Sequence, residues 1–158
     1  DMPEVNELGY NFRITDIQSS IGLSQLKRLP SMIAERQAGA EIYKSMLGDV
    51  ENLILPLDSS EIAHSWQSYV VLLKKDSNID RNELMKQLAE RGIATRPGTQ
   101  ALHMLGFYAH KYSIRPEDFP NAKWVYENSI AIPMHNKMSK EDFEYVGEVL
   151  KSLMTDSK

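Results

Sequence analysis

The chain has 158 residues, and its 18 lysines and arginines against 22 aspartates and glutamates give a net charge of −4. Hydrophobic residues make up 42% of the sequence and charged residues 25%, as is typical of one soluble globular domain. The absence of cysteine excludes disulfides, thiolate metal sites and a cysteine nucleophile. No apolar run approaches the roughly 20 residues that span a bilayer, and the dense basic face of a nucleic-acid binder is missing. We therefore expect neither a nucleic acid nor a membrane as partner.

The first predicted element is a helix that follows a polar N-terminal loop. Thr15 and Gln18 have the spacing of a capping box, in which each side chain bonds to the backbone near the other. Pro30 is expected to break or kink this helix, so we predict a second helix over about 31–47 that ends at Gly48. Such a helix pair is often an interaction element. The apolar residues of the first helix recur at helical spacing: Ile14, Ile17, Ile21, Leu26 and Leu29.

The remaining sequence alternates short strands with helices. This pattern predicts an α+β fold in which a few short strands pack with separate helices. The predicted elements are, in order, a strand within 66–73, a helix capped by Asp80 that ends at Gly92, a short strand over 93–95, a helix capped by Asp118 that ends near Asn128, a strand over 129–132, and a final helix capped by Ser139 and Asp142 with the stripe Phe143, Val146, Leu150 and Leu153.

Two polar segments could bind a ligand. Asn11 and Arg13 lie just before the first helix, where an amide and a guanidinium can bond to a phosphate. Arg96, Thr99 and His103 lie in or near a turn rich in proline and glycine, and they offer hydrogen bonds to a polar ligand. Both segments also have a purely structural interpretation, as a core plug before a helix and as a strand-to-helix connection.

The histidines do not predict a metal site. They are far apart in the sequence and lack the close spacing of metal ligands, so we expect no bound metal. The segment over 132–135, which contains His135, is interpreted as a structural strand end.

Several segments together resemble one known family. The most specific is the block over residues 9–26, Gly-Tyr-Asn-Phe-Arg-Ile-Thr-Asp-Ile-Gln-Ser-Ser-Ile-Gly-Leu-x-Gln-Leu. On these segments the chain resembles the DegT/DnrJ/EryC1/StrS aminotransferases over roughly residues 8–153. Weaker matches follow in the family's order, over 64–71, 81–93, 95–103, 119–122 and 132–135.

The resemblance implies a fold and a place in a larger enzyme. Family members are pyridoxal-phosphate enzymes of fold type I that are more than twice as long as this chain. The chain would then be the C-terminal portion, with residues 1–30 as the tail of the large domain and a linking helix. Residues 31–158 would form the small domain, in which a small antiparallel sheet packs with helices. The lysine that binds the coenzyme would lie before Asp1, so we expect no catalytic residue here and an inactive fragment.

The resemblance also implies roles for the polar segments. Asn11 matches the family asparagine that reaches the cofactor phosphate of the dimer partner, and Arg13 would line the same opening. Arg96, Thr99 and His103 lie in the segment that matches the loop of the sugar-nucleotide pocket. The run over 98–100 departs from the aromatic-and-proline pattern common in that loop, which leaves the preferred sugar and nucleotide open.

Two functions remain open at this point. The resemblance implies a homodimeric, cytoplasmic enzyme that transfers an amino group from an amino acid, with glutamate as the expected donor, to a nucleotide-linked keto sugar. The alternative is a non-catalytic binding, assembly or regulatory module that shares the fold, because a helix pair without its large domain would expose apolar surface.

Overall fold

The sheet at the centre of the molecule has four short strands, all antiparallel. A computed structural model describes residues 6–7, 9–57, 59, 61 and 63–155. The strand order is β1-β2-β4-β3, and Val71 pairs with Ile130 in the central register. The elements are α1 Asp16–Leu47, β1 Leu53–Ile54, β2 Tyr69–Leu73, α2 Arg81–Glu90, β3 Arg96–Pro97, α3 Gly106–Tyr112, α4 Pro120–Asn128, β4 Ser129–Ile132 and α5 Lys140–Thr155, with 3-10 turns at Leu102–Met104 and Pro116–Asp118. The α+β prediction is confirmed.

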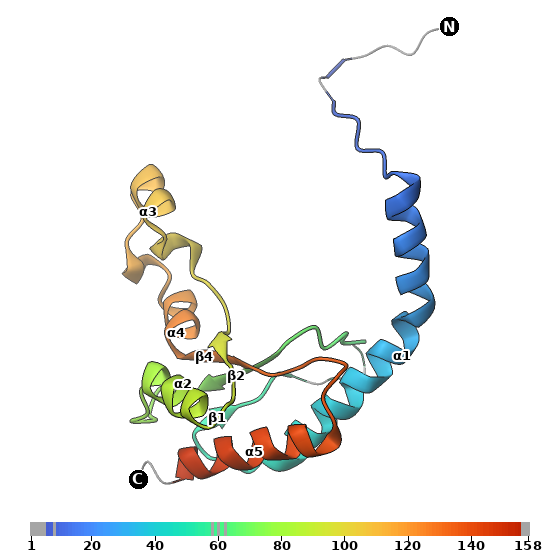
Figure 1. The fold of residues 1–158 in the computed structure, drawn as a ribbon. Helices are drawn as coiled ribbons and strands as arrows, with labels where there is room; N and C mark the ends of the chain where they lie inside the picture. Colours follow the sequence, from blue (N-terminus) through green and yellow to red (C-terminus); the bar gives the residue numbers. More distant parts are fainter. Residues whose placement is uncertain (1–5, 8, 58, 60, 62, 156–158) are drawn as a thin grey trace, which may run out of the picture.

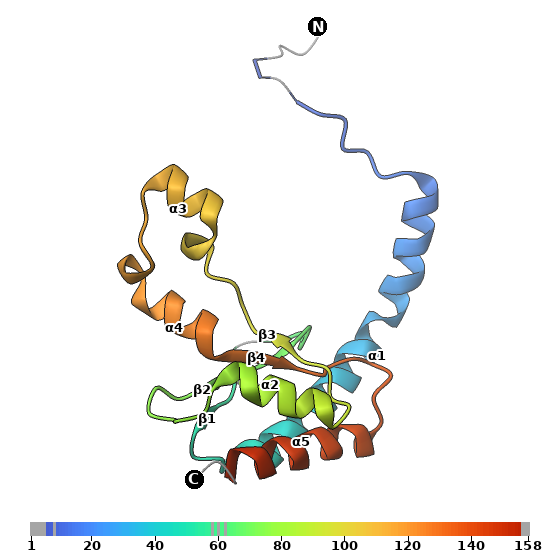
Figure 2. The same ribbon diagram turned by 60° about the vertical axis from the view of Figure 1, so that its left-hand side comes forward.

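The hydrophobic core lies between the sheet and three helices. Both ribbon views show α5 alongside the C-terminal half of α1 (Figures 1 and 2). Helix α2 contacts both α5 and strand β4. The predicted stripe of α5 is buried, and it meets buried residues from α1, α2 and both central strands. The most deeply buried of these are Tyr43, Leu47, Tyr69, Val71, Leu73, Leu88, Ile130 and Leu150.

Helix α1 continues through Pro30, so the prediction of two separate helices was wrong. Pro30 lies inside one helix of 32 residues, which changes direction part-way along its length (Figure 1). A proline removes one backbone N–H and leaves the carbonyl four residues earlier, that of Leu26, without its helical donor. Leu26 is 61% exposed, so water can replace that donor and the helix is bent rather than broken.

The N-caps predicted for three helices are confirmed, and the cap predicted for a fourth helix, Asp118, is wrong. Thr15 and Gln18 form the capping box of α1, Asp80 accepts from the backbone of Glu83, and Ser139 and Asp142 bond reciprocally at α5. Asp118, however, accepts from the backbone and guanidinium of Arg115 within a 3-10 turn, and α4 begins only at Pro120. The carboxylate is therefore used one turn earlier in the chain than expected.

Two short elements also differ from the sequence predictions. The strand expected over 93–95 is displaced to Arg96–Pro97, because pairing with Ala131 and Ile130 fixes its place. Helix α3 was not predicted, since none of its residues is buried and it lacks a side-chain N-cap. Within the described residues, no helix is both long and apolar enough to cross a membrane.

Candidate functional site

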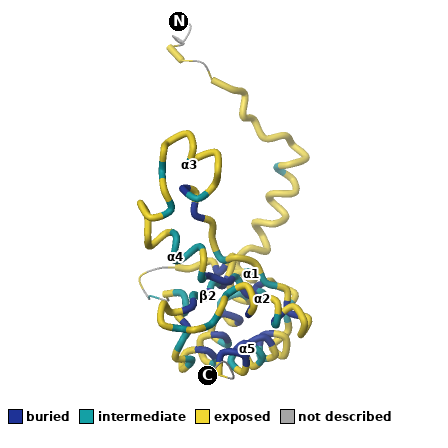
Figure 3. Tube along the Cα trace, turned by 90° about the vertical axis from the view of Figure 1, so that its left-hand side faces the viewer, coloured by how far each residue is buried: buried dark blue, intermediate teal, exposed yellow. Residues whose placement is uncertain are grey.

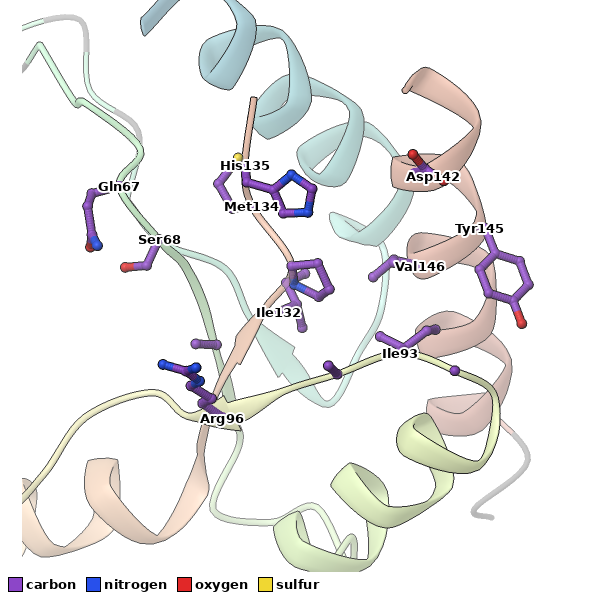
Figure 4. A pocket seen from close by; sticks show the side chains of 14 residues that line it. Gln67, Ser68, Ile93, Arg96, Ile132, Met134, His135, Asp142, Tyr145 and Val146 are labelled. Carbon is purple, nitrogen blue, oxygen red and sulfur yellow. The ribbon is translucent and has the colours of Figure 1, made fainter. Parts of the chain in front are cut away.

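A cavity opens beside Arg96. It has a volume of about 660 Å³ and lies between β3, the end of β4 and α5 (Figure 4). Gln67, Ser68 and Arg96 lie along one side in the close-up, and His135 points into the space between them and α5. The cavity thus combines amide, hydroxyl, guanidinium and imidazole groups over an apolar floor. That floor includes Ile93, Ala131, Ile132, Pro133, Met134 and Val146.

Close backbone packing places Arg96 at this cavity. The N–H of Gly98 donates to the carbonyl of Ser129 at 3.0 Å, which ends the short β3–β4 ladder. A Cβ on Gly98 would lie 2.8 Å from both Cβ and Oγ of Ser129, so a side chain there would push the two segments apart. Gly98 is therefore needed for the turn that follows Arg96, and the guanidinium remains exposed at the cavity edge.

A buried network around Trp66 positions Gln67 and Ser68. Trp66 has φ 48°, a left-handed conformation that costs energy for a bulky residue. Its indole N–H donates to the side chain of Gln37 at 2.6 Å, and its ring stacks on Tyr69. These contacts compensate for the unfavourable backbone and turn the chain so that Gln67 and Ser68 face the cavity.

His103 lies in a second cavity, of about 430 Å³. The imidazole is buried, and its Nε2 lies 3.3 Å from the carbonyl of Pro116. A carbonyl only accepts, so Nε2 is the donor of this hydrogen bond. The ring also contacts Phe119, with centroids 5.2 Å apart. His103 thus belongs to the segment around α3 and α4, and it does not line the cavity of Arg96.

Asn11 and Arg13 lie in an extended segment before α1, away from both cavities (Figures 1 and 2). Both side chains are exposed, and within the described residues neither makes a hydrogen bond or an ion pair. The Thr15–Gln18 box engages the backbone N–H groups of Thr15 and Gln18. An anion bound here would meet the Asn11 amide and the Arg13 guanidinium just before the start of the helix.

The structure does not bring the five residues named from the sequence into one site. Arg96 and His103 line different cavities, and Thr99 is exposed and lines neither. His135, which was interpreted as structural, lies in the Arg96 cavity instead. The antiparallel pairing of β3 with β4 causes this, because it carries the segment after β4 past Arg96. No signal in the sequence gives that pairing. Among the described residues there is no cluster of metal-ligating side chains.

Comparison with known proteins identifies the family. Residues 2–151 match the description of the DegT/DnrJ/EryC1/StrS aminotransferase family. The chain belongs to this family. The resemblance stated from the sequence is thereby confirmed.

Individual relatives agree with this assignment. The chain is 34% identical to the uncharacterized protein MJ1066 of Methanocaldococcus jannaschii, and the match covers 98% of this chain and 40% of that protein. It is 29% identical to the spore coat polysaccharide biosynthesis protein SpsC of Bacillus subtilis, and the match covers 96% of this chain and 39% of SpsC. Among solved structures, the PMP form of the putative sugar aminotransferase Spr1654 of Streptococcus pneumoniae matches with a TM-score of 0.86 and 27% sequence identity. This match covers 98% of this chain and 39% of Spr1654. The chain thus spans about two fifths of the length of these relatives.

The residues present fit one part of a pyridoxal phosphate site. Spr1654 is known in apo, PMP and PLP forms. Asn11 and Arg13 provide unpaired donors for a phosphate, the group that amide and guanidinium donors bind well. No lysine lines the cavity of Arg96 or that of His103, so neither cavity offers an amine to hold the coenzyme covalently.

Proposed function

We propose that this chain is the C-terminal portion of a pyridoxal-phosphate-dependent sugar aminotransferase. The enzyme would transfer an amino group from an amino acid, with glutamate as the donor, to a nucleotide-linked keto sugar in the cytoplasm. The observation that carries the proposal is the family match over residues 2–151, together with a structural relative known in both its PLP and PMP forms. The name of SpsC supports a role in polysaccharide biosynthesis.

The residues of this chain would bind and orient the reactants. Asn11 and Arg13 would hold the cofactor phosphate, and pyridoxal phosphate, when bound, supplies the carbonyl through which an amino group is exchanged. Arg96 would bind an anionic part of the substrate at the edge of the larger cavity. Thr99 and His103 would contact the substrate from the following loop. The lysine that performs proton transfer would come from the rest of the enzyme.

The exposure of α1 supports a division near residue 30. Before that point the apolar side chains of the helix are exposed, for example Ile17 at 76% and Leu26 at 61%. After Gly39 the same helix contributes Ala40, Tyr43 and Leu47 to the core. Residues 1–30 would thus pack in the assembled enzyme on the large domain or on a partner protomer, and residues 31–158 would form the small domain.

Expression of the chain alone and of its full-length parent tests this proposal. The 158-residue chain should not change the visible spectrum of added pyridoxal phosphate and should not transfer amino groups. The full-length protein should bind the coenzyme and convert glutamate and a UDP-linked or TDP-linked 4-keto sugar to 2-oxoglutarate and an amino sugar. A coenzyme bound covalently to the 158-residue chain, or a full-length protein without aminotransferase activity on any nucleotide-linked keto sugar, would contradict it.

The exposed apolar face of α1 supports the alternative function, a non-catalytic assembly module, and allows it to be tested. In the part of the chain that the structure describes, the apolar side chains of this face are exposed, among them Ile17, Ile21, Leu26 and Leu29. Sedimentation equilibrium of the 158-residue chain should show self-association that the substitutions Ile17→Ser and Ile21→Ser weaken. A monomer at high concentration would count against an assembly face, and would leave the large domain as the partner of this surface.

A further inference from the structure

The imidazole of His135 presents one N–H group to the cavity of Arg96. The backbone N–H of Lys137 donates to Nδ1 of His135 at 3.3 Å. A backbone N–H only donates, so Nδ1 bears no hydrogen and the neutral ring carries its hydrogen on Nε2. Figure 4 shows the ring pointing into the cavity. Within the described residues Nε2 has no hydrogen-bond partner, so its N–H is available to a ligand.

A set of side-chain hydrogen bonds anchors the residue that follows His135. The amide oxygen of Asn136 accepts from Nε of Arg36 at 3.0 Å. Its NH₂ group donates to the carbonyl of Met32 at 2.7 Å and to the carboxylate of Glu35 at 2.9 Å. We call these bonds the Arg36–Asn136 clamp. Because the clamp uses the acceptor and the NH₂ donors of Asn136, it fixes the backbone that carries His135.

The same arginine also holds the opposite wall of the cavity. Nη1 of Arg36 donates to the carbonyl of Trp66 at 3.4 Å, and the two residues after Trp66 line the cavity. Both walls are therefore bonded to one turn of α1, residues 32–36. This turn sets the distance between His135 and the pair Gln67 and Ser68.

The polar groups of this cavity favour a ligand that accepts hydrogen bonds and carries one negative charge. Its donors are the guanidinium of Arg96, the N–H of His135 and the side chains of Gln67 and Ser68. Of the described residues that line it, only Asp142 has a carboxylate, which already accepts from the backbone of Ser139 at 2.8 Å. The guanidinium is the one full positive charge of this lining, and it makes no ion pair with any described residue. A carboxylate matches that charge, whereas a diphosphate would bring two or more negative charges to a single cation.

We propose that His135 is a further binding residue of this cavity, which donates its Nε2–H to a carboxylate of the amino-acid donor beside Arg96. The Arg36–Asn136 clamp positions the imidazole for this contact. The inference rests on the proposed function, since an amino-acid donor is the reactant that carries such a carboxylate. It identifies the anionic group that Arg96 would bind, and it gives Arg36 and Asn136 a role as positioning residues.

Nitrogen NMR on the 158-residue chain tests the tautomer and the clamp without any catalysis. The ¹⁵N resonances of the imidazole should show the hydrogen of His135 on Nε2 at about pH 8, where histidine is commonly neutral. Asn136→Ala should release the backbone and produce a mixture of the two tautomers. A hydrogen on Nδ1 in the unsubstituted chain would overturn the inference, and an unchanged ring in Asn136→Ala would overturn the role of the clamp.

Kinetics of the full-length enzyme test the contact with the amino donor. His135→Ala should raise KM for glutamate roughly tenfold, the loss expected for one hydrogen bond to a charged group. The values of kcat and of KM for the keto sugar should stay unchanged, because the carboxylate is bound equally in the ground and transition states. His135→Gln should restore the low KM, since its amide nitrogen can reach the place of Nε2. The shorter side chain of His135→Asn replaces Nδ1 instead, so this variant should behave like His135→Ala.

His110 provides the matched control. It is an exposed histidine of α3 that does not line this cavity, so His110→Ala should leave both KM values unchanged. An equal rise of both KM values in His135→Ala, or equal rescue by glutamine and asparagine, would overturn the inference.

Binding of glutarate, a dicarboxylate without an amine, separates this inference from the proposed function. Calorimetry on the full-length protein should show roughly tenfold weaker glutarate binding in His135→Ala. If that loss is found in a protein that transfers no amino groups, only the proposed function is removed. An active aminotransferase whose affinity for glutarate is insensitive to His135→Ala would overturn the inference alone.

Discussion

Small residues set the distance between the two long helices of the core. Gly39 of α1 lies against the ring of Phe143 on α5, and a Cβ added to it would overlap that ring. Gly147 of α5 has a similar relation to Met46, whose sulfur would lie 2.8 Å from the added carbon. Each glycine therefore accepts a large side chain of the opposite helix, and the two helices approach closely at both points.

Gly39→Ala should lower the free energy of unfolding by about 1–3 kcal/mol, the usual cost of overpacking a core. Gly22 is the matched control, because it lies on the exposed half of the same helix with nothing within 4 Å of an added Cβ. Gly22→Ala should stabilise the helix by up to about 1 kcal/mol through its higher helix propensity. Urea denaturation followed by circular dichroism measures both, and equal effects of the two substitutions would show that Phe143 does not limit the approach.

Whole elements differ in how strongly they are tied to the core. Helix α5 is buried along one face from Phe143 to Met154, whereas the N-terminal half of α1 is exposed over nearly all its residues. Both helices begin with a reciprocal capping box, Ser139 with Asp142 and Thr15 with Gln18. The same local motif thus begins α5, which packs on the core from its first turn, and α1, whose first buried residue, Gly39, lies about six turns after its start.

Removing the N-caps of α5 and α1 in turn distinguishes the global free energy of unfolding from the local stability of the first turns of a helix. Ser139→Ala should lower the global free energy of unfolding by about 1 kcal/mol, because α5 cannot fray without exposing the core. Thr15→Ala removes a similar bond but should leave global unfolding nearly unchanged and accelerate amide hydrogen exchange in the first turns of α1. A global loss from Thr15→Ala as large as that from Ser139→Ala would mean that the exposed half of α1 folds as one unit with the core.

The molecule as a whole consists of one core with two projecting parts. The N-terminal half of α1 and the segment over residues 101–122, which contains α3, extend from it, and Figure 3 shows both as mainly exposed. Tyr43 lies at the centre of the core, in contact with the rings of Tyr69 and Phe143, and its hydroxyl donates to the carbonyl of Pro133 at 2.7 Å. One residue of α1 thereby connects the sheet, α5 and the segment that lines the Arg96 cavity.

The burial of Tyr43 should make the free energy of unfolding decrease at alkaline pH. Burial, followed by the charges of Tyr69 and Asp142, raises the pKa of Tyr43 well above its ordinary value of 10.0. Below pH 10 the hydroxyl is neutral in both states, and above it only the unfolded state releases the proton. Stability is therefore complete below pH 10 and should fall by about 1.4 kcal/mol per pH unit above it. Urea denaturation between pH 8 and 11.5 should show that the free energy of unfolding decreases less steeply with pH for Tyr43→Phe than for the exposed control Tyr112→Phe. Identical slopes for the two variants would contradict this.

Local interactions explain why much of the fold could be predicted from the sequence. The caps at Thr15, Asp80 and Ser139, the strand over 129–132 and the buried stripe of α5 depend on residues within a few positions of each other. The predicted strand within 66–73 was too long at its start, since Trp66 adopts a left-handed backbone that contacts with His64, the distant Gln37 and Tyr69 stabilise. Helix α3 has no buried residue, so periodicity gave no indication of it.

The sequence by itself determined the family, the fold class and most helix boundaries, because those follow from short motifs in order and from apolar spacing. Only the tertiary structure decided that α1 passes through Pro30, that Arg96 and His103 line separate cavities, and that His135 shares a cavity with Arg96. These features depend on which strands pair and which surfaces face water. Both result from contacts between residues far apart in the chain, which no local pattern encodes.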